Sequence, residues 1–147
     1  MFKHLLVPVD GSELSERAAQ VSLELAAKLG ARVTGFVAEP LPPLPTMSSN
    51  PAVYTRDAEE HRSRTEEHAQ TVLAAFGRKA AEQGVAFEGQ FQRASSVDDA
   101  IAAAAAKWGC DLIVMVTHGR GAFGELLFGS HTKNVMARTK TPLLVLH

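Results

Sequence analysis

The sequence predicts an α/β fold: a single doubly wound sheet of five parallel strands, in the order 3-2-1-4-5, with helices on both faces. Short apolar runs alternate along the chain with longer segments whose apolar residues recur every three or four positions, which is the pattern of strands joined by helices. The first and fourth runs, 5–9 and 112–116, are apolar throughout, as is typical of strands buried on both faces. We therefore place these two strands at the centre of the sheet.

The composition indicates one compact domain over residues 1–147 and excludes several classes of protein. The chain has 147 residues, 46% of them hydrophobic, and a formal net charge of −1, unlike the strongly basic chains that bind nucleic acids. No apolar run approaches the roughly 20 residues of a membrane span, and the N-terminal segment reaches Pro8 and Asp10 too early for a signal peptide. The single cysteine, Cys110, cannot form an intramolecular disulfide. We therefore expect a cytoplasmic protein with no nucleic-acid or membrane partner.

The first half of the chain contains two strands and two helices by this pattern. A helix over 14–29 follows the first strand, and a second strand follows over 32–38. The stretch after it is rich in proline and serine, and the next helical pattern begins at about Thr55 and runs to Gln83. Because the segment 40–54 follows the second strand at its carboxyl end, we expect it to be mobile and to act as a lid at the ligand site.

The second half repeats the alternation. Apolar and polar residues alternate strictly over 87–92, which indicates a strand at a sheet edge with one face in water. A helix is expected over 97–108, the buried fourth strand over 112–116, and a short helix from Ser130 to about Thr139. The apolar run 143–146 completes the sheet as its fifth strand.

Two loops meet where the predicted strand order reverses, which is where doubly wound sheets bind ligands. The first begins at Asp10, whose carboxylate can accept hydrogen bonds from a ribose hydroxyl or an exocyclic amine. The alternative is that Asp10 or Ser12 caps the following helix, and one residue can do both. The second loop, 117–131, is rich in glycine and carries Arg120; its glycines suit either an anion or a tight turn.

Several short motifs together resemble those of single-domain universal stress proteins, within the adenine-nucleotide-binding α-hydrolase-like fold group. They cover essentially the whole chain: Leu5-Leu6-Val7-Pro8-Val9-Asp10-Gly11-Ser12, Asp111-Leu112-Ile113-Val114-Met115, Thr117-His118-Gly119-Arg120-Gly121, Gly129-Ser130 and Thr141-Pro142-Leu143-Leu144-Val145.

The resemblance implies an adenine nucleotide, ATP, with Mg²⁺ accompanying it, and a homodimer formed through the last strand, Leu143, Leu144, Val145 and Leu146. It also implies nucleotide-binding residues: Pro8, Asp10, Val37 and Met115 at the adenine and ribose, and Gly119, Gly129, Ser130 and the His131 amide at the phosphates. From its place in the second loop, Arg120 is expected to supply positive charge to the same phosphates. ATP-binding members carry Gly-x-x-Gly, nine residues, then Gly-Ser or Gly-Thr. Counting back from Gly129, the first glycine falls on Val116, where this chain departs from the pattern.

Three hypotheses for the function stay open. The favoured one is a nucleotide-binding stress-response regulator without efficient turnover, and the second is a family member that has lost nucleotide binding and acts through dimerisation and protein contacts. A slow ATPase is the third, and no catalytic or metal-binding residue is assigned for it. His61 and His68 lie seven positions apart on a helix, too far to share a metal, and are expected on a solvated face. Cys110 is expected to be an inert core thiol.

Overall fold

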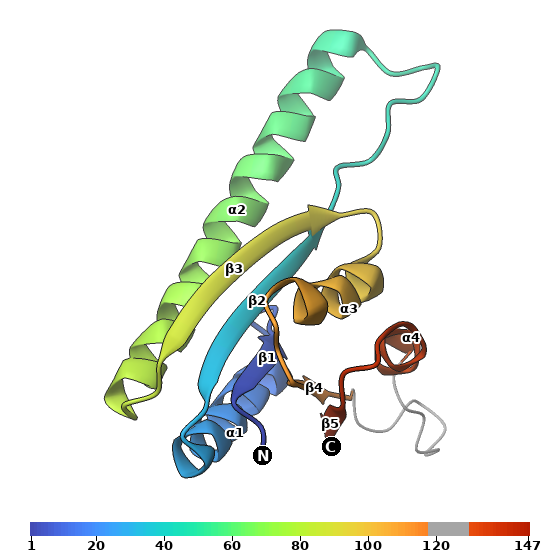
Figure 1. Cartoon of the computed structure of the whole chain (residues 1–147). Coiled ribbons are helices and arrows are strands. Elements are labelled where there is room, and N and C mark those ends of the chain that lie inside the picture. Colours follow the sequence, from blue (N-terminus) through green and yellow to red (C-terminus); the bar gives the residue numbers. More distant parts are fainter. Residues whose placement is uncertain (118–129) are drawn as a thin grey trace.

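The computed structural model describes residues 1–117 and 130–147, which fold around one parallel sheet (Figure 1). The elements in chain order are β1 (His4–Pro8), α1 (Glu13–Leu29), β2 (Arg32–Pro40), α2 (Pro51–Glu82), β3 (Phe87–Ala94), α3 (Val97–Lys107), β4 (Leu112–Val116), α4 (Ser130–Arg138) and β5 (Leu143–Leu146).

The strand order is β3-β2-β1-β4-β5, and every adjacent pair of strands is parallel. This confirms the fold class and the order predicted from the sequence. The two fully apolar runs form the adjacent strands β1 and β4, and β3 lies at one edge with most of its residues only half-buried. No helix in the described part of the chain is both long and apolar enough to cross a membrane.

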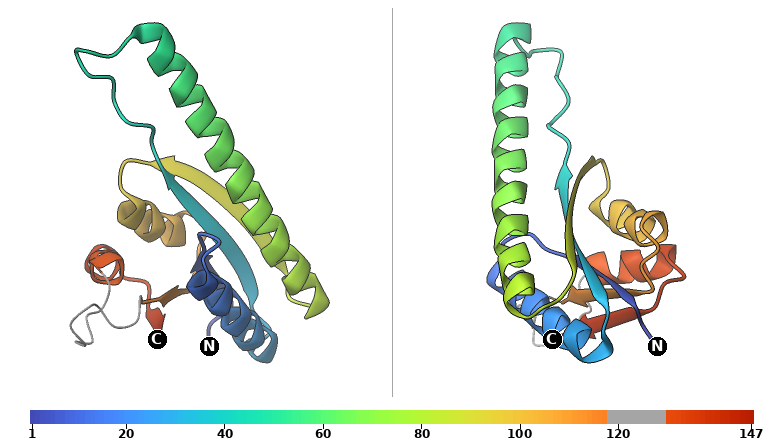
Figure 2. Two further views of the ribbon diagram at one scale, coloured as in Figure 1. Left: turned by 180° about the vertical axis from the view of Figure 1, so that it is seen from behind. Right: turned by 60° about the vertical axis from the view of Figure 1, so that its left-hand side comes forward.

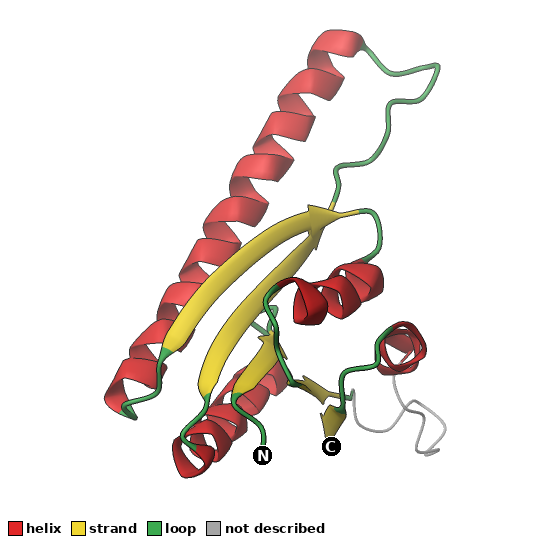
Figure 3. Cartoon of the chain, viewed as in Figure 1, coloured by secondary structure: helices red, strands yellow, loops and turns green. Residues whose placement is uncertain are grey.

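The helices cover both faces of the sheet, as Figures 2 and 3 show. On one face, Val7 and Val37 pack with Leu23 of α1 and Phe76 of α2. On the other face, the neighbouring strand residues pack against α3 and α4; these include Leu6, Phe36, Ile113 and Met115. Successive strand residues point to opposite faces, so neighbours in sequence enter different cores. This alternation decides which strand residues can reach a ligand site.

Local capping explains where the helices begin and end. The Ser12 side chain accepts a hydrogen bond from the Ser15 N–H at 3.2 Å and caps α1, which ends at Gly30 in a left-handed conformation with φ 61°. The Asn50 side chain accepts from the Ala52 N–H at 3.0 Å, with Pro51 at the first helical position. The expectation that α2 starts at Thr55 is therefore wrong: the helix begins one turn earlier.

Candidate functional site

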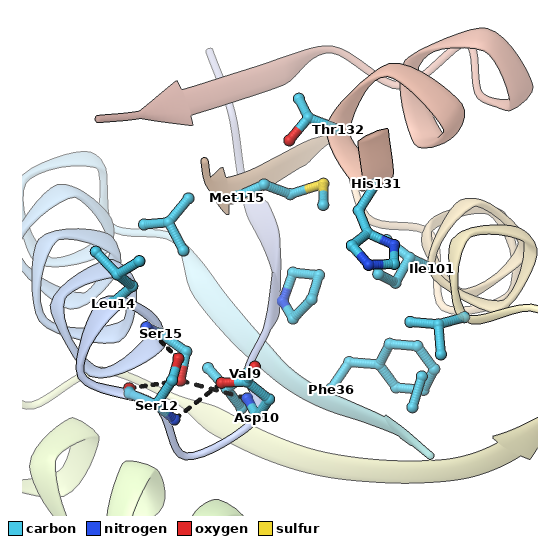
Figure 4. Close-up of a pocket in the computed structure, with 14 residues that line it drawn as sticks. Val9, Asp10, Ser12, Leu14, Ser15, Phe36, Ile101, Met115, His131 and Thr132 are labelled. Carbon is cyan, nitrogen blue, oxygen red and sulfur yellow. Dashed lines mark hydrogen bonds between the residues drawn. The ribbon is translucent and has the colours of Figure 1, made fainter. Parts of the chain in front are cut away.

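A cavity of about 370 Å³ opens at the carboxyl ends of β1 and β4, where the strand order reverses (Figure 4). Both strands contribute to it, together with the loop after β1, the end of β2 and the first turns of α3 and α4. The described lining residues are Pro8, Val9, Asp10, Ser12, Leu14, Ser15, Phe36, Ala38, Val97, Ile101, Met115, Val116, His131 and Thr132.

Most of the lining is apolar. Phe36 is fully buried, and Ile101 and Met115 expose 4% and 6% of their surface. Pro8, the last residue of β1, and Val116, the last residue of β4, also line the cavity. A surface of this kind favours a flat apolar group such as an aromatic base, because it offers few polar atoms that would have to be satisfied.

The loop after β1 supplies the polar groups of one rim. The Asp10 carboxylate accepts a hydrogen bond from the Ser12 N–H at 2.9 Å, and the Ser15 hydroxyl accepts one from the Gly11 N–H at 3.1 Å and donates to the Ser12 carbonyl at 3.0 Å. Of the two capping candidates, Ser12 is the one that caps α1. The Asp10 carboxylate lies exposed at the rim, on the cavity side of this network.

His68 of α2 is hydrogen-bonded to this loop, a contact that was not predicted from the sequence. Its Nε2–H donates to the main-chain carbonyl of Asp10, with 2.8 Å between nitrogen and oxygen. Gly11 lies directly beside it with φ 84°; a Cβ on Gly11 would lie 3.1 Å from the His68 ring and 2.9 Å from Val72. His68 is exposed, as predicted, and its ring also holds the loop that carries Asp10, which was not predicted.

The opposite rim belongs to α4. Figure 4 shows the His131 ring turned from α4 toward the cavity. Its Nδ1 lies 2.6 Å from Oδ1 of Asp98, in the first turn of α3, and the Asn134 amide donates to Oδ2 of the same carboxylate at 2.7 Å. Asp98 is only 9% exposed. Nothing local in the sequence links Asp98 to His131, so this contact could not be predicted from a motif.

The structure brings most of the described predicted site residues together. Pro8, Asp10, Met115, Val116 and His131 all line the cavity. Ser130 is the exposed first residue of α4, next to His131, and does not itself line the cavity. Gly119, Arg120 and Gly129 lie outside the described residues.

The side chain of Val37 does not line the cavity. It is 1% exposed and packs in the core beneath α1 and α2, on the face of the sheet opposite the cavity. Its neighbours Phe36 and Ala38 line the cavity instead. The physical reason is the two-residue period of a strand, which turns adjacent side chains to opposite faces.

The segment 40–54 does not cover this cavity in the structure. Residues 51–54 form the first turn of α2, and Pro42, Leu44 and Asn50 line a separate hollow against that helix. The described residues that line the cavity include none from 40–54.

Cys110 lies at the opposite end of the sheet from the cavity, before β4. Its Sγ is 3.6 Å from Nε2 of His4, which also lies 2.7 Å from the Thr34 hydroxyl. Burial raises the pKa of the Cys110 thiol to about 11, so the thiol is protonated and a poor nucleophile at neutral pH. Burial, reinforced by the positive charge of Arg32, lowers the pKa of His4. This cluster belongs to the core. Within residues 1–117 and 130–147, no group of three His, Cys, Asp or Glu side chains could hold a metal ion.

Comparison with known proteins identifies the family. The model of the universal stress protein family matches residues 1–147. The chain is 35% identical to the universal stress protein in the QAH/OAS sulfhydrylase 3′ region of Thermus aquaticus, over 99% of this chain and 98% of that protein.

Solved structures share the fold. A universal stress protein in complex with cAMP has a TM-score of 0.71 and 23% identity, covering 99% of this chain and 97% of that one. The universal stress protein from Archaeoglobus fulgidus in complex with dAMP has a TM-score of 0.60 and 17% identity, covering 100% of this chain and 98% of that one. Because the family model matches the whole chain, this chain belongs to the universal stress protein family.

Proposed function

We propose that this chain binds an adenine nucleotide, ATP, in the cavity at the ends of β1 and β4, and that it acts as a cytoplasmic stress-response regulator without efficient turnover. The observation that carries the proposal is the form of the cavity. Its apolar floor lies between the Asp10 carboxylate on one rim and the first turn of α4 on the other.

Each part of a nucleotide has a matching part of the cavity. The base fits the apolar floor formed by Phe36, Ile101 and Met115, and the ribose hydroxyls can donate to the exposed Asp10 carboxylate. The phosphates fit the N-terminus of α4 at Ser130, because the amide groups of a helix's first turn and the helix dipole favour an anion. Mg²⁺ would enter with the triphosphate. Two solved relatives are complexes with cAMP and with dAMP, which supports this ligand class.

The test is a pair of matched substitutions. Ala38 is half-buried and lines the cavity, whereas Ala94 is half-buried at the end of the neighbouring strand β3 and does not line it. We expect ATP binding by calorimetry in the wild type and in Ala94→Phe, and a loss of about tenfold or more in Ala38→Phe, because the new ring occupies the volume of the base. Absence of binding to the wild type, or equal losses in both variants, would contradict the proposal.

One observation favours a second candidate, a family member that acts through dimerisation and protein contacts alone. Val116 replaces the first glycine of the nucleotide pattern, lines the cavity and pairs with Leu146 of β5. Its side chain therefore occupies space that a glycine would leave to the ligand. Unchanged thermal unfolding of the wild type on addition of ATP would favour this candidate.

We also propose a homodimer, through the outer edge of β5. This strand ends the sheet, and Leu143, Leu144, Val145 and Leu146 are all half-buried in the isolated chain. Exposed apolar edges of this kind favour pairing with another strand. An antiparallel pair of β5 strands about a twofold axis would give each protomer the same contact.

A further inference from the structure

The His131–Asp98 pair at the cavity has a geometry that capping and packing do not require. Asp98 is a buried carboxylate, and both of its oxygens accept hydrogen bonds from α4, one from His131 and one from Asn134. These two donors are three residues apart and so lie on the same face of α4. Asp98 therefore fixes the rotation of α4 relative to α3 and the orientation of the His131 ring.

The hydrogen bond to Asp98 also fixes the chemistry of the ring. A carboxylate only accepts, so Nδ1 of His131 carries the hydrogen. In the neutral imidazole, Nε2 then has a lone pair. When the ring is protonated, Nε2 becomes a donor while Nδ1 stays hydrogen-bonded to the Asp98 carboxylate on the other side. The side chain of His131 is 62% exposed and lines the cavity, so Nε2 is accessible to a ligand.

Among residues 1–117 and 130–147, other charged groups around this site come from three elements. Asp99, next to Asp98 on α3, is paired with Arg138 at the far end of α4. Lys133 is exposed on α4, and Asp10 faces the cavity from the loop after β1. Asp98 is hydrogen-bonded to the ring, so a buried carboxylate faces Nδ1 of His131.

We propose that the His131 side chain is a phosphate-binding group, that Asp98 is its positioning residue, and that His131 takes up a proton from solvent when a phosphorylated ligand binds. This inference rests on the proposed nucleotide function and adds to it a side-chain contact and a preference for phosphorylated over unphosphorylated adenine ligands. The phosphate oxygens accept the Nε2–H bond, and Asp98 accepts the Nδ1–H bond, so that the imidazolium lies between two anions.

Calorimetry with ATP and with adenosine tests the proposal, using His131→Gln, Asp98→Asn and the control Asp99→Asn. The control makes the same change in net charge on the same helix without touching His131. Titrations in two buffers of different ionisation enthalpy give the number of protons taken up on binding.

We expect ATP binding to weaken about tenfold or more in His131→Gln and in Asp98→Asn but to change little in Asp99→Asn. Adenosine affinity should be nearly the same in all four proteins. Proton uptake with ATP should be larger in the wild type than in His131→Gln.

Two results would overturn the proposal. One is proton uptake that is identical in the wild type and in His131→Gln. The other is an equal loss of adenosine and ATP affinity in Asp98→Asn, which would make Asp98 a structural anchor only. Adenosine binding to the wild type separates these failures from that of the proposed function: if neither ligand binds the wild type, both proposals fall.

Discussion

Val116 is the position at which the chain departs from the nucleotide pattern, and replacing it gives the sharpest test of how the cavity binds. Val116 is the last residue of β4, is half-buried, pairs with Leu146 and lines the cavity. Val116→Ala removes two methyl groups and keeps ordinary strand geometry. Val116→Gly removes the Cβ as well as both methyl groups and so also frees the backbone to approach a ligand.

The cost in stability can be worked out from this placement. Burying a methylene fully contributes about 0.8 kcal/mol, so two half-buried methyl groups contribute about 1 kcal/mol to the free energy of unfolding. Glycine in a strand adds a further cost of about 0.5–1 kcal/mol relative to alanine. Val116→Gly should therefore lower the free energy of unfolding by about 2 kcal/mol, or Tm by about 4–8 °C in a chain of this size.

Although Val116→Gly should lower the stability of the chain, it should raise the affinity for ATP. If a close backbone approach restores one or two hydrogen bonds to the ribose or phosphates, ATP binding should tighten about tenfold to a hundredfold in Val116→Gly. Val116→Ala should show a smaller gain, because it relieves crowding alone. Calorimetry with ATP measures the affinities, and thermal unfolding verifies that both variants are folded at the titration temperature. Unchanged affinity in both variants would refute the reasoning and leave Val116 as a residue that merely extends β4.

Three further predictions concern assembly and stability. The Leu146 carbonyl accepts a hydrogen bond from the Thr117 N–H, so by strand alternation the Val145 N–H points away from β4. Val145→Pro should therefore dissociate a β5-paired dimer in sedimentation, whereas Val145→Ala should leave it intact. A dimeric Val145→Pro would contradict the β5 interface. Burial and Arg32 lower the pKa of His4 below the 6.5 of an exposed histidine, so the unfolded chain binds more protons and stability falls as the pH drops below about 6.5. Urea unfolding at several pH values should show this fall in the wild type and a smaller fall in His4→Gln. If the free energy of unfolding changes equally with pH in both proteins, His4 is not the cause. A Cβ on Gly35 would lie 2.8 Å from the Phe87 ring. Gly35→Ala should therefore lower the free energy of unfolding by about 1–3 kcal/mol in the same assay. Unchanged stability would mean that the Phe87 ring moves freely.

The order of the sheet could be predicted because it depends on patterns that are local in the sequence. Two runs that are apolar throughout had to be central, and an alternating run had to be an edge. The start of α2 could also have been predicted, because Asn50 followed by Pro51 is the combination of an N-cap and a first helical residue. The composition of the surrounding segment, rich in proline and serine, obscured it.

The site could be predicted only in part, because its support comes from distant residues. His68 and Asp10 are 58 residues apart, and His131 and Asp98 are 33 apart, so no local pattern links either pair. Val37 shows a different limit. A family resemblance assigns a position in the sequence, whereas the face of the sheet on which a side chain lies depends on strand alternation. In β2 this alternation turns the side chains of Phe36 and Ala38 toward the cavity.

An NMR titration of the wild-type protein with ATP can locate ATP in the cavity at the carboxyl ends of β1 and β4. We expect chemical-shift changes of backbone amides that line the cavity, including those of Asp10, Ala38 and His131, and none at His4 and Cys110 at the other end of the sheet. No shift changes with millimolar ATP, or changes confined to residues away from the cavity, would contradict this expectation.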